Sequence, residues 1–114
     1  MMIHLYGIPN CDTVKKARVW LDDRGLDYTF HDYKKEGADL AKLATWIDAA
    51  GLDTVLNRRG TTYRRLSDAE KADIDGGKAV SVLVQHPSTI KRPIVEHEGG
   101  LLVGFKPEEW DAAF

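Results

Sequence analysis

The chain has 114 residues and a formal net charge of −2, from 16 Lys and Arg residues against 18 Asp and Glu residues. This size suits one domain with its own hydrophobic core. The near balance of charge gives no indication of a nucleic-acid or membrane-surface partner. No apolar run approaches the roughly 20 residues that a membrane span needs, and one cysteine excludes an internal disulfide. We therefore expect a cytoplasmic protein with no membrane association and no direct nucleic-acid binding.

The first part of the chain predicts a strand, a turn, a helix and a second strand. Residues 3–6 are typical of a strand, and residues 12–24 of a helix that ends at Gly25. Residues 26–33 alternate with period two, so the second strand should run parallel to the first, with a right-handed crossover. The apolar residues at helical spacing, which should form the inner face of the helix, are Val14, Ala17, Trp20 and Leu21.

Cys11 lies where this first helix is expected to begin. The unpaired N–H groups and the positive end of the helix dipole at such a position stabilise a thiolate over a thiol. A lone cysteine can also be a small buried hydrophobe. However, side chains at the carboxyl end of a strand tend to point toward ligands. We interpret Cys11 as a reactive thiol, with Lys15 and Lys16 adding positive potential and Asp12 opposing it.

The middle of the chain predicts a largely helical insertion at about residues 35–86. A helix is expected over residues 38–50, ended by Gly51. Four apolar residues recur in it at helical spacing. They are Leu40, Leu43, Ala44 and Ile47.

Two further patterns follow within the insertion. Ser67 and Glu70 have the spacing of a capping box, which predicts a short helix through Ile74. Residues 78–86 are ambiguous, because alternating valines favour a strand whereas the flanking glycines and proline would also frame a helix.

The last part predicts a β-hairpin and a helix. Apolar runs at residues 90–97 and 101–105 are joined by a Gly-Gly turn. Pro107 then opens a helix whose first turn carries two glutamates, which suit the positive end of its dipole. The four histidines are scattered without metal-ligand spacing, so we expect no metal site.

The predicted order is β-α-β, a helical insertion and β-β-α, which resembles the thioredoxin arrangement of a mixed central sheet with helices on its faces. Three motifs carry a closer resemblance, to the arsenate-reductase-like (ArsC/Spx) family and its YffB-type members: residues 6–17, 56–66 and 86–94. The family implies a single α/β, thioredoxin-like domain over residues 1–114. It also implies a helix at residues 78–86.

The resemblance implies roles for individual residues. Cys11 matches the nucleophile of the family, and Arg59 and Arg92 fall where the family places arginines that hold an oxyanion or a thiol-bearing partner. The bond between Arg92 and Pro93 should be cis, although an ordinary trans bond is the commoner case. For Arg59 the alternative is a solvated basic face. Asn10 either donates to a bound anion or serves only the turn.

The sequence also departs from the arsenate reductases, with Val14 in place of a serine and Lys106 in place of an arginine. Both changes should weaken a site for a small tetrahedral anion. We expect a thiol-dependent oxidoreductase in which Cys11 attacks an oxidised substrate that the sequence does not identify. An external thiol, with glutathione as the obvious candidate, then resolves the product.

The alternative is a protein that binds RNA polymerase, as a regulator among the relatives of this family does. That regulator uses a two-cysteine redox switch, and Val14 occupies the position of its second cysteine. Any regulatory role here would therefore be independent of redox state.

Overall fold

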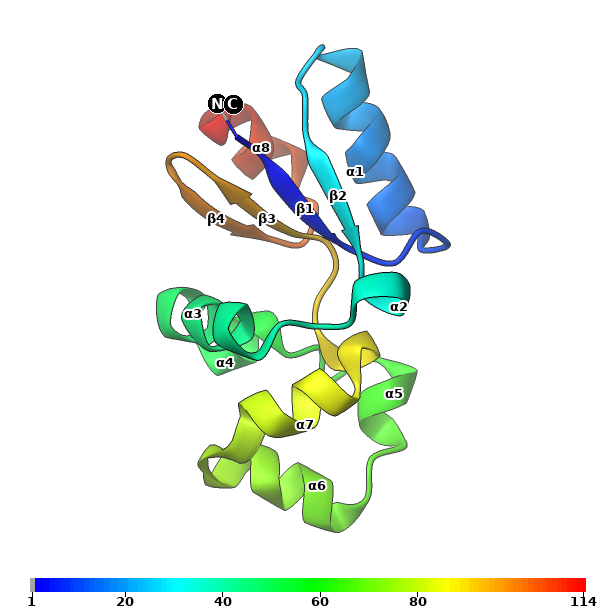
Figure 1. The fold of residues 1–114 in the computed structure, drawn as a ribbon, viewed down its shortest axis with the longest axis vertical. Helices are drawn as coiled ribbons and strands as arrows, with labels where there is room; N and C mark the ends of the chain where they lie inside the picture. Colours follow the sequence, from blue (N-terminus) through cyan, green and yellow to red (C-terminus); the bar gives the residue numbers. More distant parts are fainter. Residues whose placement is uncertain (1) are drawn as a thin grey trace. The chain divides into compact units, whose positions relative to one another are not determined.

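The computed structural model describes residues 2–114, which fall into two compact units. One consists of the chain up to Glu36 together with residues 92–114, and the other of residues 37–91. The first contains the β-sheet and the second is helical (Figure 1). The helical unit corresponds to the insertion expected at about residues 35–86. That the whole chain forms one domain stays a prediction.

The first unit is built on a four-stranded mixed sheet with the strand order β2-β1-β3-β4 (Figure 1). β1 pairs in parallel with β2 and antiparallel with β3, and β3 pairs antiparallel with β4. This arrangement confirms the predicted α/β, thioredoxin-like fold. The elements are β1 (His4–Gly7), α1 (Asp12–Asp23), β2 (Thr29–Asp32), α2 (Tyr33–Glu36), β3 (Ile94–His97), β4 (Gly100–Val103) and α8 (Pro107–Ala113).

The second strand is shorter at both ends than the alternation of residues 26–33 predicts: it begins at Thr29, and at its other end Tyr33 begins α2. The side chain of Asp32 explains the change of direction. Its Oδ1 accepts a hydrogen bond of 2.8 Å from the backbone N–H of Lys34, a local turn that competes with the strand.

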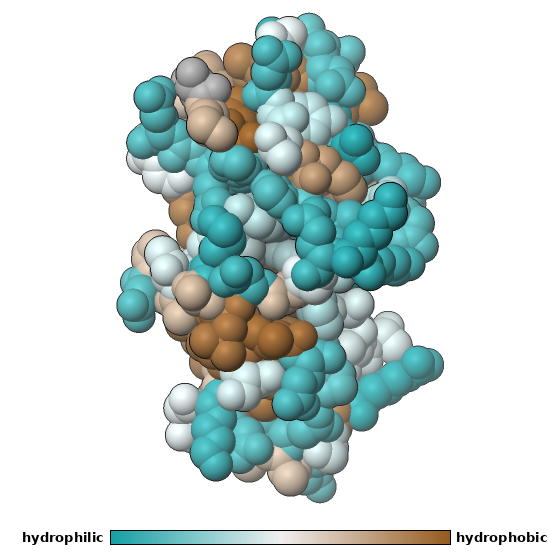
Figure 2. Space-filling view, viewed as in Figure 1, coloured by the Kyte–Doolittle hydropathy of each residue, from teal (hydrophilic) through white to brown (hydrophobic). Residues whose placement is uncertain are grey.

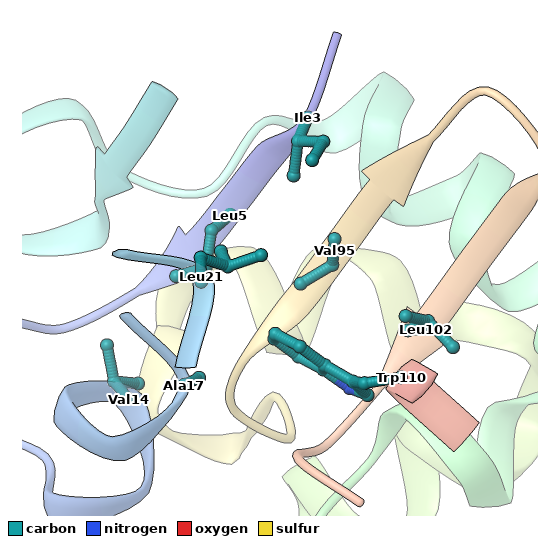
Figure 3. Packing of buried hydrophobic residues seen from close by; sticks show 8 residues of the cluster. All are labelled: Ile3, Leu5, Val14, Ala17, Leu21, Val95, Leu102 and Trp110. Carbon is teal, nitrogen blue, oxygen red and sulfur yellow. The ribbon is translucent and has the colours of Figure 1, made fainter. Parts of the chain in front are cut away.

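The core of this unit lies between the sheet and helices α1 and α8 (Figure 3). Three of the four residues predicted for the inner face of α1 are fully buried in it, while Trp20 is half-buried and packs against its edge. The ring of Trp20 meets that of Trp110 edge-on, with centroids 5.4 Å apart. The buried members are Ile3, Leu5, Val14, Ala17, Leu21, Val95, Leu102 and Trp110.

Helix α1 approaches β1 most closely at Gly7. A Cβ atom at this position would lie 2.9 Å from Cγ2 of Val14, closer than real contacts allow. Val14 is fully buried, so its methyl groups have little room to move. The absence of a side chain at Gly7 therefore sets how near the start of α1 lies to the end of β1.

The second unit consists of short helices joined by tight turns. The capping box of Ser67 and Glu70 is confirmed, and so is a helix in residues 78–86. The local valine alternation was therefore misleading. The elements are α3 (Leu40–Ala50), α4 (Leu52–Val55), α5 (Thr61–Arg64), α6 (Asp68–Asp73), the π-helical turn Ile74–Lys78, α7 (Ala79–Gln85) and the 3₁₀ turn Pro87–Thr89.

One of the four apolar residues at helical spacing lies outside the core. Leu40 is 57% exposed, because it is the first residue of α3, directly after the N-cap Asp39, and does not reach the buried face. Leu43 and Trp46, three residues apart, form that face instead. The sequence prediction had not included Trp46.

The visible surface in Figure 2 is largely hydrophilic, with smaller hydrophobic areas. Among residues 2–114, the exposed large hydrophobic side chains are Met2, Val19 and Leu40. No helix in this described part of the chain is long and apolar enough to cross a membrane.

The close approach of α1 to β1 gives a first prediction. Gly7→Ala should lower the free energy of unfolding by about 1–3 kcal/mol, because the added methyl group overpacks the contact with Val14. The same substitution should cost less in a Val14→Ala background, where the obstructing methyl groups are gone. Urea unfolding of the four proteins of this cycle measures both. Equal costs in the two backgrounds would contradict the assignment of the clash to Val14.

Candidate active site

Cys11 is the N-cap residue of α1, with extended backbone angles of φ −104° and ψ 125°. Its carbonyl oxygen accepts the first helical hydrogen bond, 2.9 Å from the backbone nitrogen of Lys15. Its side chain makes no capping hydrogen bond, in contrast to the usual serine or aspartate at an N-cap. The thiol is half-exposed at the edge of the core, neither used as a cap nor sealed inside.

The electrostatics at this position are those of a helix start. The first N–H groups of α1 have no partners within the helix and present partial positive charge. Lys15 and Lys16 are exposed on the first two turns, and Asp12 is exposed beside the thiol with the opposite effect. The start of α1 and the two lysines therefore present positive potential on this side of the sheet unit, which Asp12 partly offsets.

The peptide bond between Arg92 and Pro93 is cis, as the family resemblance implies. Pro93 is buried directly before β3, whose first residue, Ile94, pairs with Tyr6 near the end of β1. Because the two strands are antiparallel, the segment before Ile94 lies at the same end of the sheet as the segment after Tyr6. That second segment leads into Cys11.

Asn10 and Arg92 also belong to the sheet unit. Asn10 is exposed, and its Oδ1 accepts a hydrogen bond of 3.4 Å from Nζ of Lys34, which leaves the amide N–H groups as donors. Arg92 is half-buried, and within residues 2–114 its guanidinium has neither an ion pair nor a hydrogen bond. Both side chains therefore keep donors available for an anion.

Tyr33 is a buried polar residue that sequence reasoning missed. It is 5% exposed, and its hydroxyl has no hydrogen-bond partner in the described part of the chain. Burial raises the pKa of Tyr33 well above its usual range, with Tyr6 and Glu96 adding to the increase and Arg92 opposing it. Tyr33 therefore stays a neutral phenol at any working pH. The only sequence signal was the alternation that makes it the last residue of the predicted strand.

Arg59, the remaining predicted site residue, belongs to the helical unit. Its backbone N–H donates to Oδ1 of Asn57 at 3.2 Å, while its exposed guanidinium has no partner among residues 2–114. The segment just before Arg59 is bonded to residues 89–91. The backbone nitrogen of Asn57 donates to the carbonyl of Thr89, and that of Lys91 to the carbonyl of Val55, each at 2.8 Å.

These segments line an open pocket of about 530 Å³ within the helical unit. Its lining contains three cations and one carboxylate. The lining residues are Asp53, Leu56, Asn57, Arg58, Arg59 and Lys91. The sequence did not predict the pocket, because it depends on the pairing of two segments more than thirty residues apart.

Arg58 and Arg59 are adjacent in sequence but differ in their surroundings. The Arg58 guanidinium contacts Asp75 at 3.1 Å, Asp53 at 3.2 Å and the Tyr63 hydroxyl at 3.0 Å. Hydrogen bonding to Asp75, and then to Asp53 and Tyr63, raises the pKa of Arg58 above its usual range. The guanidinium of Arg58 therefore links three side chains within the helical unit. The guanidinium of Arg59 has no such partner in residues 2–114 and remains available to bind an anion.

The histidines take part in local polar pairs. Nδ1 of His4 lies 2.9 Å from Nε2 of His31, and Nε2 of His86 lies 2.6 Å from Oε2 of Glu70. Within residues 2–114, no three His, Cys, Asp or Glu side chains are grouped so that they could hold a metal ion.

A cysteine after β1, a cis proline before β3 and a mixed sheet with a helical insertion define a thioredoxin-like protein. Residues 6–113 match the ArsC family, and the chain belongs to that family. This agrees with the resemblance carried by the three sequence motifs.

Individual relatives show how far the similarity extends. The structure of the YffB protein is 52% identical, covers 97% of each chain and superposes with a TM-score of 0.92. An arsenate reductase (ArsC) related protein from Brucella melitensis is 47% identical, covering 98% of this chain and 93% of its own, with a TM-score of 0.75. The global transcriptional regulator Spx of Lactiplantibacillus plantarum is 24% identical over 110 residues, covering 95% of this chain and 83% of its own.

The contrast between the two adjacent arginines gives a second prediction. Arg58→Ala should lower the free energy of unfolding by about 1 kcal/mol, because it removes a cation shared by two exposed carboxylates. Arg59→Ala should change it by less than about 0.5 kcal/mol. Urea denaturation followed by circular dichroism compares the two variants. If Arg59→Ala lowers the free energy of unfolding more than Arg58→Ala does, the assignment of a structural role to Arg58 and not to Arg59 is wrong.

Proposed function

We propose that this protein is a glutathione-dependent thiol reductase with Cys11 as its nucleophile. The observation that carries the proposal is the position of Cys11, half-exposed at the N-terminus of α1 and without a capping hydrogen bond. The position of the segment before β3 at the same end of the sheet and membership of the ArsC family support it. Glutathione as the reductant fits a reducing compartment, so we also propose a cytoplasmic location.

The chemistry at Cys11 is a pair of thiol–disulfide exchanges. The Cys11 thiolate attacks one sulfur of an oxidised substrate, forms a new S–S bond and expels the other sulfur as a thiolate. The thiolate of a second molecule then attacks the sulfur attached to Cys11 and releases the Cys11 thiolate. Since the chain has no other cysteine, that second thiol comes from glutathione. These two exchanges leave the substrate sulfur in a mixed disulfide with glutathione. The thiolate of a second glutathione attacks the glutathione sulfur of that mixed disulfide and releases the substrate thiolate, so two glutathione molecules supply the two electrons and leave as glutathione disulfide.

Arginine and amide side chains would hold the carboxylates of glutathione. Arg92 is half-buried and unpaired within residues 2–114, and it is joined to Pro93 in the segment that leads into β3. Arg59 provides a second unpaired guanidinium, and Asn10 provides amide donors next to the nucleophile. Charge-assisted hydrogen bonds from a planar guanidinium suit a carboxylate. In this proposal Cys11 is catalytic, and Arg59, Arg92, Asn10 and Pro93 form the substrate-binding set.

Arsenate is not part of the proposal, although some relatives carry the name arsenate reductase. Val14 offers no hydroxyl group, and its side chain is buried against Gly7. Lys106 presents an ammonium instead of a guanidinium, and its Nζ lies 3.5 Å from Oε2 of Glu109. Both features argue against a site built around a small tetrahedral oxyanion.

The similarity to Spx favours a second candidate, a regulator that binds RNA polymerase independently of redox state. The Val14 side chain fills the core at the position of the second cysteine of the redox switch. The Cys11→Ser variant should therefore still bind RNA polymerase. A polymerase pull-down with that variant separates this candidate from the reductase.

The third prediction concerns the reaction of Cys11 with glutathione disulfide. The wild-type protein should gain one glutathione in intact mass, and Cys11→Ser should gain none. Arg92→Ala should slow the reaction more than Arg59→Ala, because a charge-assisted hydrogen bond is worth roughly 1.5–3 kcal/mol when desolvated and less at an exposed position. Intact-mass spectrometry of samples quenched at successive times gives the rates of adduct formation.

Lysine replacements serve as the matched controls for the two arginines. Arg92→Lys and Arg59→Lys should recover only part of the lost rate, because a point charge does not reproduce the guanidinium fork. If both alanine variants react at the wild-type rate, the arginines do not hold the tripeptide. If the wild-type protein forms no adduct, the glutathione proposal itself fails.

A further inference from the structure

The pocket of the helical unit is lined by charged side chains, some paired with residues of the chain and some unpaired. Of its three lining cations, Arg58 is neutralised by Asp53 and Asp75. The side chains of Arg59 and Lys91 have no ion pair or hydrogen bond with any residue from 2 to 114. The pocket therefore presents two cations that remain available to an anion.

Asp53 adds one available acceptor to the same pocket. Its side chain is 86% exposed, and both hydrogen bonds from Arg58 end on its Oδ1. No donor within the described part of the chain is bonded to its Oδ2. Hence the lining of the pocket combines two unpaired cations with a free carboxylate oxygen.

A ligand matching these features carries a carboxylate and an ammonium close together, as an α-amino acid group does. The two ends of glutathione differ in this respect. The γ-glutamyl end has a free α-carboxylate and α-ammonium, whereas the glycine end has a carboxylate only. A volume of about 530 Å³ is within the range of small-molecule sites, about 300–1,000 Å³.

We propose that this pocket binds the γ-glutamyl end of glutathione, with Arg59 and Lys91 on its carboxylate and Asp53 on its ammonium. The inference rests on the proposed glutathione-dependent function and adds which end of the tripeptide the protein recognises. It assigns binding roles to Lys91 and Asp53. An inorganic anion would contact the two cations but would leave Oδ2 of Asp53 without a donor.

The experiment is an NMR titration of full-length, ¹⁵N-labelled Cys11→Ser protein with thioethers that cannot exchange sulfur. The three probes are S-methylglutathione, γ-glutamyl-S-methylcysteine and S-methylcysteinylglycine. The first two should shift the backbone amides of Asn57, Arg59 and Lys91 in a saturable manner. The third lacks the γ-glutamyl group and should shift these amides little at the same concentrations.

Lys91→Ala should weaken binding of the first two probes about two- to fivefold, as loss of one exposed charge contact implies. The matched control, Lys78→Ala, changes an exposed lysine outside the pocket lining and should bind as the parent does. Equal shifts from all three probes, or shifts confined to other amides, would overturn the inference. So would equally strong shifts from inorganic phosphate, since the pocket would then be a simple anion site.

The titration tests binding separately from the reductase reaction, because neither the Cys11→Ser protein nor the thioether probes can form a disulfide bond. Glutathionylation of wild-type Cys11 without binding in the pocket overturns the pocket assignment alone. Binding in the pocket without any adduct on the wild-type protein supports the pocket assignment and contradicts the reductase.

Discussion

The contact between Gly7 and Val14 is the constraint on which the sheet unit depends. Because Gly7 has no side chain, the buried methyl groups of Val14 come against the end of β1, and the first turn of α1 is fixed there. The N-cap residue of that turn is Cys11. The packing of a core valine thus determines where the sulfur of Cys11 lies relative to the free N–H groups of the helix. Since Val14 carries no thiol, the proposed exchange takes its resolving thiol from outside the chain.

Charge is divided in a comparable way in the helical unit. Arg58 is held by two carboxylates and a phenol, whereas Arg59 and Lys91 have no such partners within residues 2–114. A buried or networked charge mainly supports structure, and an unpaired one beside a pocket is available for a ligand. Three cations near one another therefore have different roles, which only their surroundings reveal.

Local chemistry in the sequence was sufficient for much of the fold. The start of α1, the glycine after it, the capping box at Ser67 and the hairpin all depend on short-range preferences, and the structure contains each of them. Residues 78–86 show the limit of such preferences, because tertiary context made a helix of a strand-like valine pattern. The pocket and the buried hydroxyl of Tyr33 depend on segments that are distant in sequence, so no local pattern predicted them. The exposure of Leu40 has a related reason, since helical spacing identifies a face of the helix but not which residue first reaches the core.

The central claim is that Cys11 undergoes thiol–disulfide exchange with glutathione while cationic side chains bind the carboxylates of the tripeptide. A crystal structure of the wild-type protein after reaction with glutathione disulfide tests it most directly. The account predicts a disulfide bond from Sγ of Cys11 to the glutathione sulfur, with a carboxylate of the tripeptide on the guanidinium of Arg92 or Arg59. A glutathione attached to Cys11 that contacts neither arginine, or a Cys11 that remains a free thiol, would contradict it.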